Sequence, residues 1–90
     1  MRFPAGLSVI EDEAFSGNQN LMFAEIDSGA SNIGNRAFEG SGLLQIIIRG
    51  AQTEIAADAF GTISPQIICQ PGSKAESFAR QNGYDYVYLP

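Results

Sequence analysis

A short block that recurs three times at a nearly constant spacing limits what this 90-residue chain can fold into. The block reads Ile, three mostly polar or small residues, and then Ala-Phe, and its copies are residues 10–15, 33–38 and 55–60. The isoleucines at 10, 33 and 55 lie 23 and then 22 residues apart. A unit of this length cannot bury its own apolar side, so successive units must stack and share a continuous core.

A second pattern recurs between the blocks. Residues 21–26 align with residues 43–48, and both read Leu, two residues, an apolar residue, one residue, Ile. This pattern predicts a short strand in each unit, whereas we expect the Ala-Phe step to form one turn of helix. Stacking then predicts ladders of equivalent residues: Phe15/Phe38/Phe60, Ala14/Ala37/Ala59, Ile10/Ile33/Ile55, Leu21/Leu43, Ala24/Ile46 and Phe3/Ile26/Ile48.

The period ends after the third block, and the residues that follow predict a cap. Ser73 followed three residues later by Glu76 is a capping box, which marks the start of a helix, and Gly83 stands where a helix usually stops. The last unit would expose its apolar ladder unless something covered it. We therefore expect Phe78, on the apolar side of this helix, to pack on Phe60.

Residues 84–89 alternate in polarity and predict a terminal strand. The tyrosines at 84, 86 and 88 have two interpretations: they pack on the cap, or they form a platform on which a ligand stacks. Packing is favoured, because aromatic rows more often supply apolar contact area with the polar tip in water.

These patterns predict one domain of the leucine-rich-repeat type, an α/β solenoid built mostly of β-strands and turns. Short parallel strands would stack in about three coils, followed by one C-terminal capping helix. The domain would span residues 1–90, with a partial repeat (1–9), two repeats (10–32 and 33–54), a last incomplete repeat (55–70) and a helix–strand cap (71–90). An ordinary α+β domain with chance spacings is the alternative, and three copies of the block argue against it.

The amino-acid composition limits which kinds of function the chain can have. Ten acids against five scattered bases give a net charge of −5, whereas nucleic-acid binding needs a basic stripe. The chain has no histidine, so we predict no catalytic residue, no cofactor and no metal site. The acidic run 11–13 indicates a solvated turn, since a calcium loop needs alternating oxygen ligands around a glycine. The single cysteine, Cys69, indicates a buried structural thiol.

The repeat block and the closing segment resemble the bacterial surface-antigen (BspA-like) leucine-rich repeat family. Residues 33–38 (Ile-Gly-Asn-Arg-Ala-Phe) match the family's block fully, residues 3–10 resemble the linker after its strand, and residues 71–83 resemble the segment that often closes these arrays. The chain departs from the family pattern in three ways. Glu11 and Ala56 replace a glycine, and Asn18 or a neighbour replaces a frequent cysteine. Ala24 stands at a core position that usually holds a larger residue.

The resemblance implies an extracellular or cell-surface location in bacteria. It also implies an adhesin or interaction protein that contacts host extracellular-matrix or cell-surface proteins. The sequence itself shows no signal peptide at its start and no apolar stretch of the roughly 20 residues needed to span a membrane.

The outward side chains of the predicted strands are the candidate binding site. Alternate side chains of a strand leave the core, and the concave strand face is the usual binding surface of a solenoid. The candidate protein-binding residues are Phe23, Glu25, Asp27, Gln45, Ile47 and Arg49, with Met22 and Leu44 beside them. Phe23 and Ile47 would form an apolar centre with a polar rim, unless loops or a second copy cover them.

A spacer or self-association element of a longer repeat array is the alternative function. An open N-terminal coil would expose Phe3, Leu7, Ile10 and Phe15. Such an end should stack on further repeats or form a homodimer.

Overall fold

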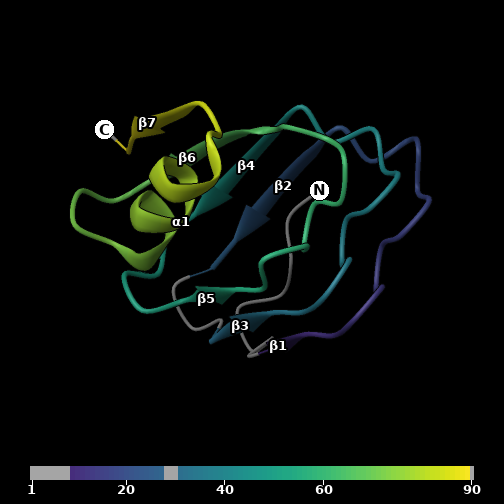
Figure 1. The fold of residues 1–90 in the computed structure, drawn as a ribbon, viewed down its shortest axis with the longest axis horizontal. Coiled ribbons are helices and arrows are strands. Elements are labelled where there is room, and N and C mark those ends of the chain that lie inside the picture. Colours follow the sequence, from purple (N-terminus) through teal and green to yellow (C-terminus); the bar gives the residue numbers. More distant parts are fainter. Residues whose placement is uncertain (1–8, 28–30, 90) are drawn as a thin grey trace.

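A computed structural model describes residues 9–27 and 31–89 as two parallel β-sheets and one helix (Figure 1). The larger sheet has the order β2-β4-β6-β7 and the smaller one β1-β3-β5. The elements are β1 (Val9–Ile10), β2 (Phe23–Ile26), β3 (Asn32–Ile33), β4 (Gln45–Ile48), β5 (Glu54–Ile55), β6 (Gln66–Cys69), α1 (Lys74–Asn82) and β7 (Tyr86–Tyr88). Short parallel strands and one C-terminal helix agree with the sequence, whereas closure into a solenoid of about three coils stays a prediction.

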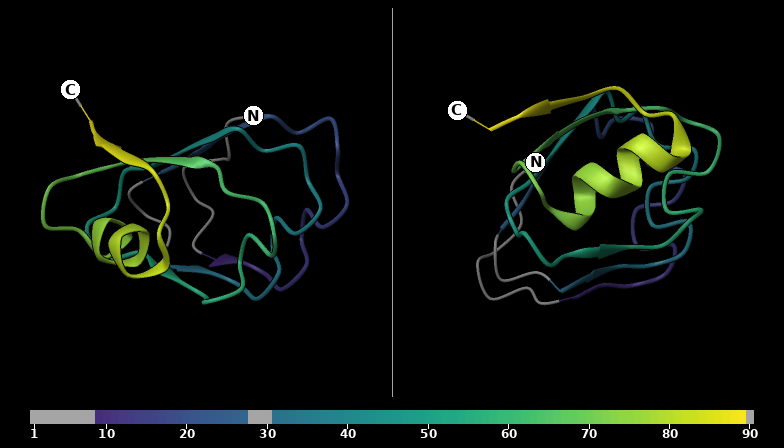
Figure 2. Two further views of the ribbon diagram at one scale, coloured as in Figure 1. Left: turned by 45° about the horizontal axis from the view of Figure 1, so that its top comes forward. Right: turned by 60° about the vertical axis from the view of Figure 1, so that its left-hand side comes forward.

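The strands pair so that equivalent residues of successive repeats lie side by side. All described strand pairs are parallel. The register confirms three predicted ladders: Ile10/Ile33/Ile55, Ala24/Ile46 and Ile26/Ile48. Phe3, which the sequence places in the last of these ladders, lies outside the described residues. The core occupies the space between the two sheets, and α1 contacts both β5 and β6 at one end of it (Figure 2).

The phenylalanine column, Phe15, Phe38 and Phe60, runs through this core. The rings of Phe15 and Phe38 stack with centroids 5.6 Å apart, and those of Phe38 and Phe60 stack at 5.8 Å. Phe78 of α1 meets Phe60 edge-on at 6.0 Å, so the predicted cap contact is confirmed. Tyr84 adds a second edge contact to Phe60 at 5.5 Å and stacks on Phe78 at 5.4 Å.

The Ala-Phe step is a run of tight turns, so the expected turn of helix is wrong. Glu13 and Arg36 have φ values of 60° and 54°, which a right-handed helix excludes. The physical reason is the hydrogen bonding between repeats. The amides of Glu13 and Phe15 donate to the carbonyls of Asn35 and Ala37 in the next repeat, at 2.9 and 2.8 Å, and cannot also close a helix.

The capping box at the start of α1 is confirmed, with one difference in its partners. The Ser73 hydroxyl accepts from the Glu76 amide at 3.1 Å. The Glu76 carboxylate accepts from the Gly72 amide at 2.6 Å, because the Ser73 amide already donates to the Gln70 carbonyl. The other Glu76 oxygen accepts from the Tyr88 hydroxyl at 2.7 Å. This carboxylate therefore links the helix start to β7, and Glu76 as a whole is only 8% exposed.

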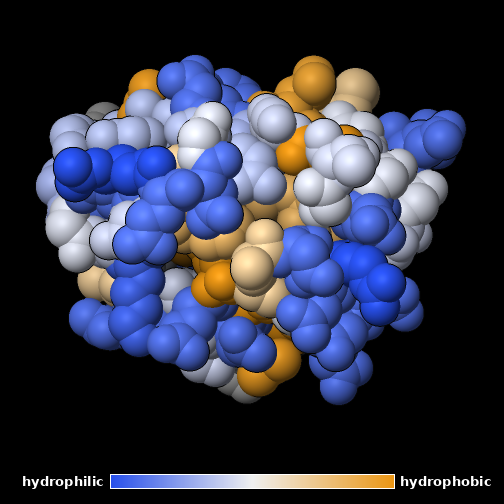
Figure 3. Space-filling view, in the orientation of Figure 1, coloured by the Kyte–Doolittle hydropathy of each residue, from blue (hydrophilic) through white to orange (hydrophobic). Residues whose placement is uncertain are grey.

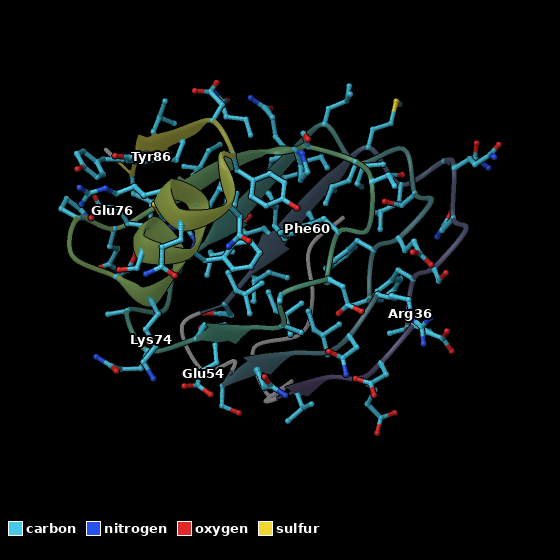
Figure 4. The ribbon with its side chains drawn as sticks, viewed as in Figure 1. Arg36, Glu54, Phe60, Lys74, Glu76 and Tyr86 are labelled. Carbon is cyan, nitrogen blue, oxygen red and sulfur yellow. The ribbon has the colours of Figure 1, made fainter. Side chains whose placement is uncertain are left out.

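The terminal tyrosines support the packing interpretation. Tyr84 and Tyr86 are partly buried and pack on the core, and Figure 4 shows Tyr86 and Glu76 on the same side of α1. The Tyr88 ring is half exposed, but its hydroxyl is committed to Glu76. On the face that α1 covers, hydrophobic residues remain visible in a central strip bordered by hydrophilic ones (Figure 3).

Replacing a phenylalanine of the column by alanine should destabilise the fold most when that residue is in the middle of the column. Phe38 is fully buried, whereas Phe15 is partly exposed. We expect Phe38→Ala to lower the free energy of unfolding by about 3–5 kcal/mol, a large part of the stability of a domain of this size. Phe15→Ala should cost clearly less, because part of that ring already contacts water. Urea denaturation followed by circular dichroism measures both, and equal losses would contradict the stacking order.

The Glu76 carboxylate should make the cap sensitive to acid. Its pKa lies below the usual value, mainly because of the Tyr88 hydroxyl and then the Gly72 amide. A carboxyl group with a lowered folded-state pKa stabilises the fold above its unfolded pKa, about 4.3, and loses that contribution as the pH falls through the folded value. We expect Glu76→Gln to be less stable than the parent chain at neutral pH. The stability difference should shrink below pH 4, and a constant difference in thermal melts would exclude this role.

Candidate protein-binding surface

The outer sheet face, meaning the outward side chains of β2, β4, β6, β7 and their flanking residues, holds all six predicted site residues. Burial alternates along each of the first three strands, with Ala24, Ile46 and Ile67 turned to the core. Of the six predicted residues, Phe23, Gln45 and Arg49 are exposed, and Glu25, Asp27 and Ile47 are partly buried. The structure therefore places the six predicted residues on one face.

An apolar row crosses the centre of this face. Strand register places Glu25 beside Ile47, Ile47 beside Ile68, and Ile68 beside Val87. Ile47 and Ile68 are partly buried, and Val87 is 42% exposed. The apolar row, Ile47, Ile68 and Val87, is therefore longer than the sequence analysis expected. Ile68 was missed although the same alternation, applied to residues 65–69, would have identified it, and Val87 was missed because its place depends on how β7 pairs.

An amide ladder borders the apolar row toward the strand starts. The Gln45 side-chain amide donates to the Gln66 side-chain oxygen at 3.0 Å, and Gln66 donates to the Asp85 carboxylate at 3.3 Å. Strand register places Phe23 at the other end of this ladder, beside Gln45. Because each hydrogen bond joins neighbouring strands, the ladder holds these polar groups in fixed positions.

An ion pair lies at the β2 end of the apolar row, where Glu25 stands beside Ile47, and it extends to Arg49 on the side away from the amide ladder. The Arg49 guanidinium donates to the Glu25 carboxylate at 2.7 Å, which joins two repeats. Beyond the strand starts, Met22 and Leu44 are the most exposed large apolar side chains among the described residues, at 58% and 66%. The outer sheet face thus combines apolar side chains with hydrogen-bonded polar groups.

Two further features bear on the chemistry of the described residues, namely the grouping of possible metal ligands and the single cysteine. Within residues 9–27 and 31–89, no three His, Cys, Asp or Glu side chains are grouped so as to hold a metal. Cys69 is buried as predicted, and burial raises the pKa of its thiol more than a hydrogen bond with Ser73 lowers it. The described part of the chain contains no helix long and apolar enough to cross a bilayer.

A hollow of about 330 Å³ lies between α1 and β5, away from the predicted residues. Ile55 and Phe78 form its apolar wall, and Glu54 and Lys74 stand at its border. These two charged groups form an ion pair at 2.9 Å (Figure 4). The hollow thus offers a shallow, charge-balanced surface, in contrast to the extended row of the outer sheet face.

The first repeat exposes fewer of its apolar residues than the prediction of an open N-terminal coil requires. Ile10 is only 1% exposed, so the prediction that it lies on an open surface is wrong. Its side chain points into the core between the sheets, like those of Ile33 and other ladder residues. Phe15 is partly exposed, and Phe3 and Leu7 lie outside the described residues.

Comparison with known proteins gives one family match. A family model described as a BspA type leucine-rich repeat region (6 copies) matches residues 1–78. The match includes all three repeat blocks and ends within α1, so the end of the helix and β7 lie beyond it. No curated protein and no solved structure matches the chain.

Proposed function

The chain belongs to the BspA-type leucine-rich repeat family, and we propose that it is a non-catalytic protein-binding module of a cell-surface, adhesin-type protein. The proposed binding surface is the outer sheet face, which would be the concave strand face of a repeat solenoid. The proposed partner is a host extracellular-matrix or cell-surface protein. These assignments combine the location and role that are typical of the family with the chemistry of one face.

The observation that carries the proposal is the apolar row with polar borders on both sides. Protein interfaces typically place apolar groups at the centre and polar groups at the rim. Here Ile47 and Ile68 hold the centre, while the amide ladder and the Glu25–Arg49 pair flank them. A partner that covered this row would remove apolar surface from water without having to bury the paired charges at the centre.

The polar groups of this face are already ordered before any partner arrives. Gln45, Gln66 and Asp85 are joined by hydrogen bonds across three strands, and Glu25 and Arg49 across two. Ordering a long side chain on binding costs roughly 0.5–1.5 kcal/mol. Side chains that are held in place in the free protein avoid part of that cost, which favours recognition by this face.

Binding should depend on the middle of the apolar row. We expect Ile47→Asp to abolish saturable binding to any extracellular-matrix or serum protein that captures the parent chain on an immobilised panel. The new carboxylate would lie beside Glu25 and Ile68, so a covering partner would have to bury an unpaired charge. Ala57→Asp is the matched control, since it adds the same charge at an exposed turn residue away from the sheet.

Circular dichroism should first confirm that both variants remain folded. Binding that survives Ile47→Asp would move the site away from the outer sheet face. Absence of binding by the parent chain to every panel member would favour the alternative function below.

The alternative, a spacer or self-association element of a longer array, is favoured by exposure at the first repeat. Ala14 is exposed, whereas its equivalents Ala37 and Ala59 are completely buried. A hollow of about 170 Å³ lies there, lined by Val9, Ile10, Glu11, Ala14 and Phe15. Its apolar lining suits another repeat or a second copy of the chain.

Self-association through this end should respond to a charge at its centre. If the hollow pairs two chains, light scattering coupled to size-exclusion chromatography should report a dimer, and Ala14→Asp should release monomers, because the carboxylate would be buried in the interface. Ala57→Asp again serves as the control. A monomeric parent chain at high concentration would rule out the homodimer.

A further inference from the structure

We propose that the segment bound by the outer sheet face is a basic polypeptide with aliphatic side chains between its positive charges. This inference rests on the proposed function, because it names the chemistry of the partner for the same face. It follows from the distribution of charge over the described residues and from the positions of two acids relative to the apolar row.

Most bases of the described residues are already paired with acids. Arg36 lies 3.7 Å from Glu13, and Lys74 lies 2.9 Å from Glu54. On the outer sheet face, the base is Arg49, and it is paired with Glu25. The chain as a whole carries ten acids and five bases, so its potential is negative. A negative surface attracts positively charged partners and raises their association rate.

The outer sheet face carries more acid than base. Its described acids are Glu25, Asp27 and Asp85, and its described base is Arg49, which leaves a charge of −3 + 1 = −2. The Asp85 carboxylate accepts a hydrogen bond from a neutral amide, Gln66, which leaves its charge uncompensated in that contact. A partner that brings a cation to Asp85 would therefore gain a charge-assisted hydrogen bond.

Two of these acids stand at opposite corners of the face. Asp85 precedes β7 at the end of the amide ladder, and Asp27 follows β2 on the other side of the apolar row. Three strand spacings of about 4.8 Å and four residues of about 3.3 Å separate them, which gives about 20 Å along the diagonal. An extended segment of about six residues spans that distance. The geometry therefore fits two basic residues about six positions apart, with aliphatic residues between them over Ile47 and Ile68.

Other occupants fit less well. A nucleic acid or an acidic protein surface would bring negative charge to a face that is itself negative. A second copy that used the same face would oppose two such faces across a two-fold axis. A basic peptide segment matches both the apolar row and the negative charge of this face.

Peptide selection tests the inference without a known partner. Random dodecapeptides displayed on phage would be selected on the immobilised parent chain, and the enriched peptides would then be tested for binding to the Ile47→Asp variant. We expect the selected peptides to be enriched in Lys or Arg on both sides of an aliphatic pair. Synthetic versions should bind more weakly as the salt concentration rises, because exposed charge pairs are screened.

Neutralising the two corners provides the matched comparison. We expect Asp85→Asn and Asp27→Asn each to lower the affinity for the peptide by about two- to fivefold, the range expected for an exposed ion pair. Asp58→Asn, which removes an exposed acid in the last repeat's turn, should leave affinity unchanged.

Different experimental outcomes would overturn the basic-partner inference and the proposed function. Peptides that require Ile47 but lack basic residues, or that are insensitive to Asp85→Asn and Asp27→Asn, would overturn this inference alone. Enriched peptides that bind Ile47→Asp as well as the parent chain, or no enrichment at all, would overturn the proposed function with it. A dimer that Ile47→Asp dissociates would assign the face to a second copy and overturn the basic-partner inference.

Discussion

The spacing between the rings of the phenylalanine column governs how the repeats can sit on one another. The stacked pairs have centroids 5.6 and 5.8 Å apart, close to the separation of about 4.8 Å between paired strands. One geometry therefore satisfies ring stacking and strand pairing together. A repeat that slipped in register would lose the column and would turn its core side chains to the opposite face of the sheet. Phe78 and Tyr84 then end the column, since both meet Phe60 edge-on.

The same register arranges the proposed binding surface. When Ala24, Ile46 and Ile67 line up toward the core, the residues that alternate with them must line up on the outside, which produces the apolar row and the amide ladder. Recognition by this face would thus rest on the rigidity of the stack rather than on a separate loop or cavity. Core and surface are coupled, so a substitution in the phenylalanine column should disturb the outer rows as well.

The repeats and the cap could be predicted because they depend on residue identity at a fixed period. Hydrogen bonds between repeats have no such signature: the expected turn of helix is replaced by tight turns because the Glu13 and Phe15 amides donate to the next repeat. The glycine of the middle block has a related cause, since a Cβ on Gly34 would lie 2.5 Å from an Asp12 carboxylate oxygen. Val87 was missed because its place beside Ile68 depends on how β7 pairs, which the alternation of residues 84–89 does not specify.

Methyl spectroscopy of the isoleucines tests most directly whether the outer sheet face binds. Both β4 and β6 carry two adjacent isoleucines. One of each pair lies in the core (Ile46, Ile67) and the other on the outside (Ile47, Ile68), so each strand has a methyl probe on either side. Titration with a bound protein or selected peptide should shift the Ile47 and Ile68 signals and leave Ile46 and Ile67 nearly unchanged. Shifts confined to Ile10 or Ile55, with Ile47 and Ile68 unaffected, would contradict the account and move the binding surface elsewhere.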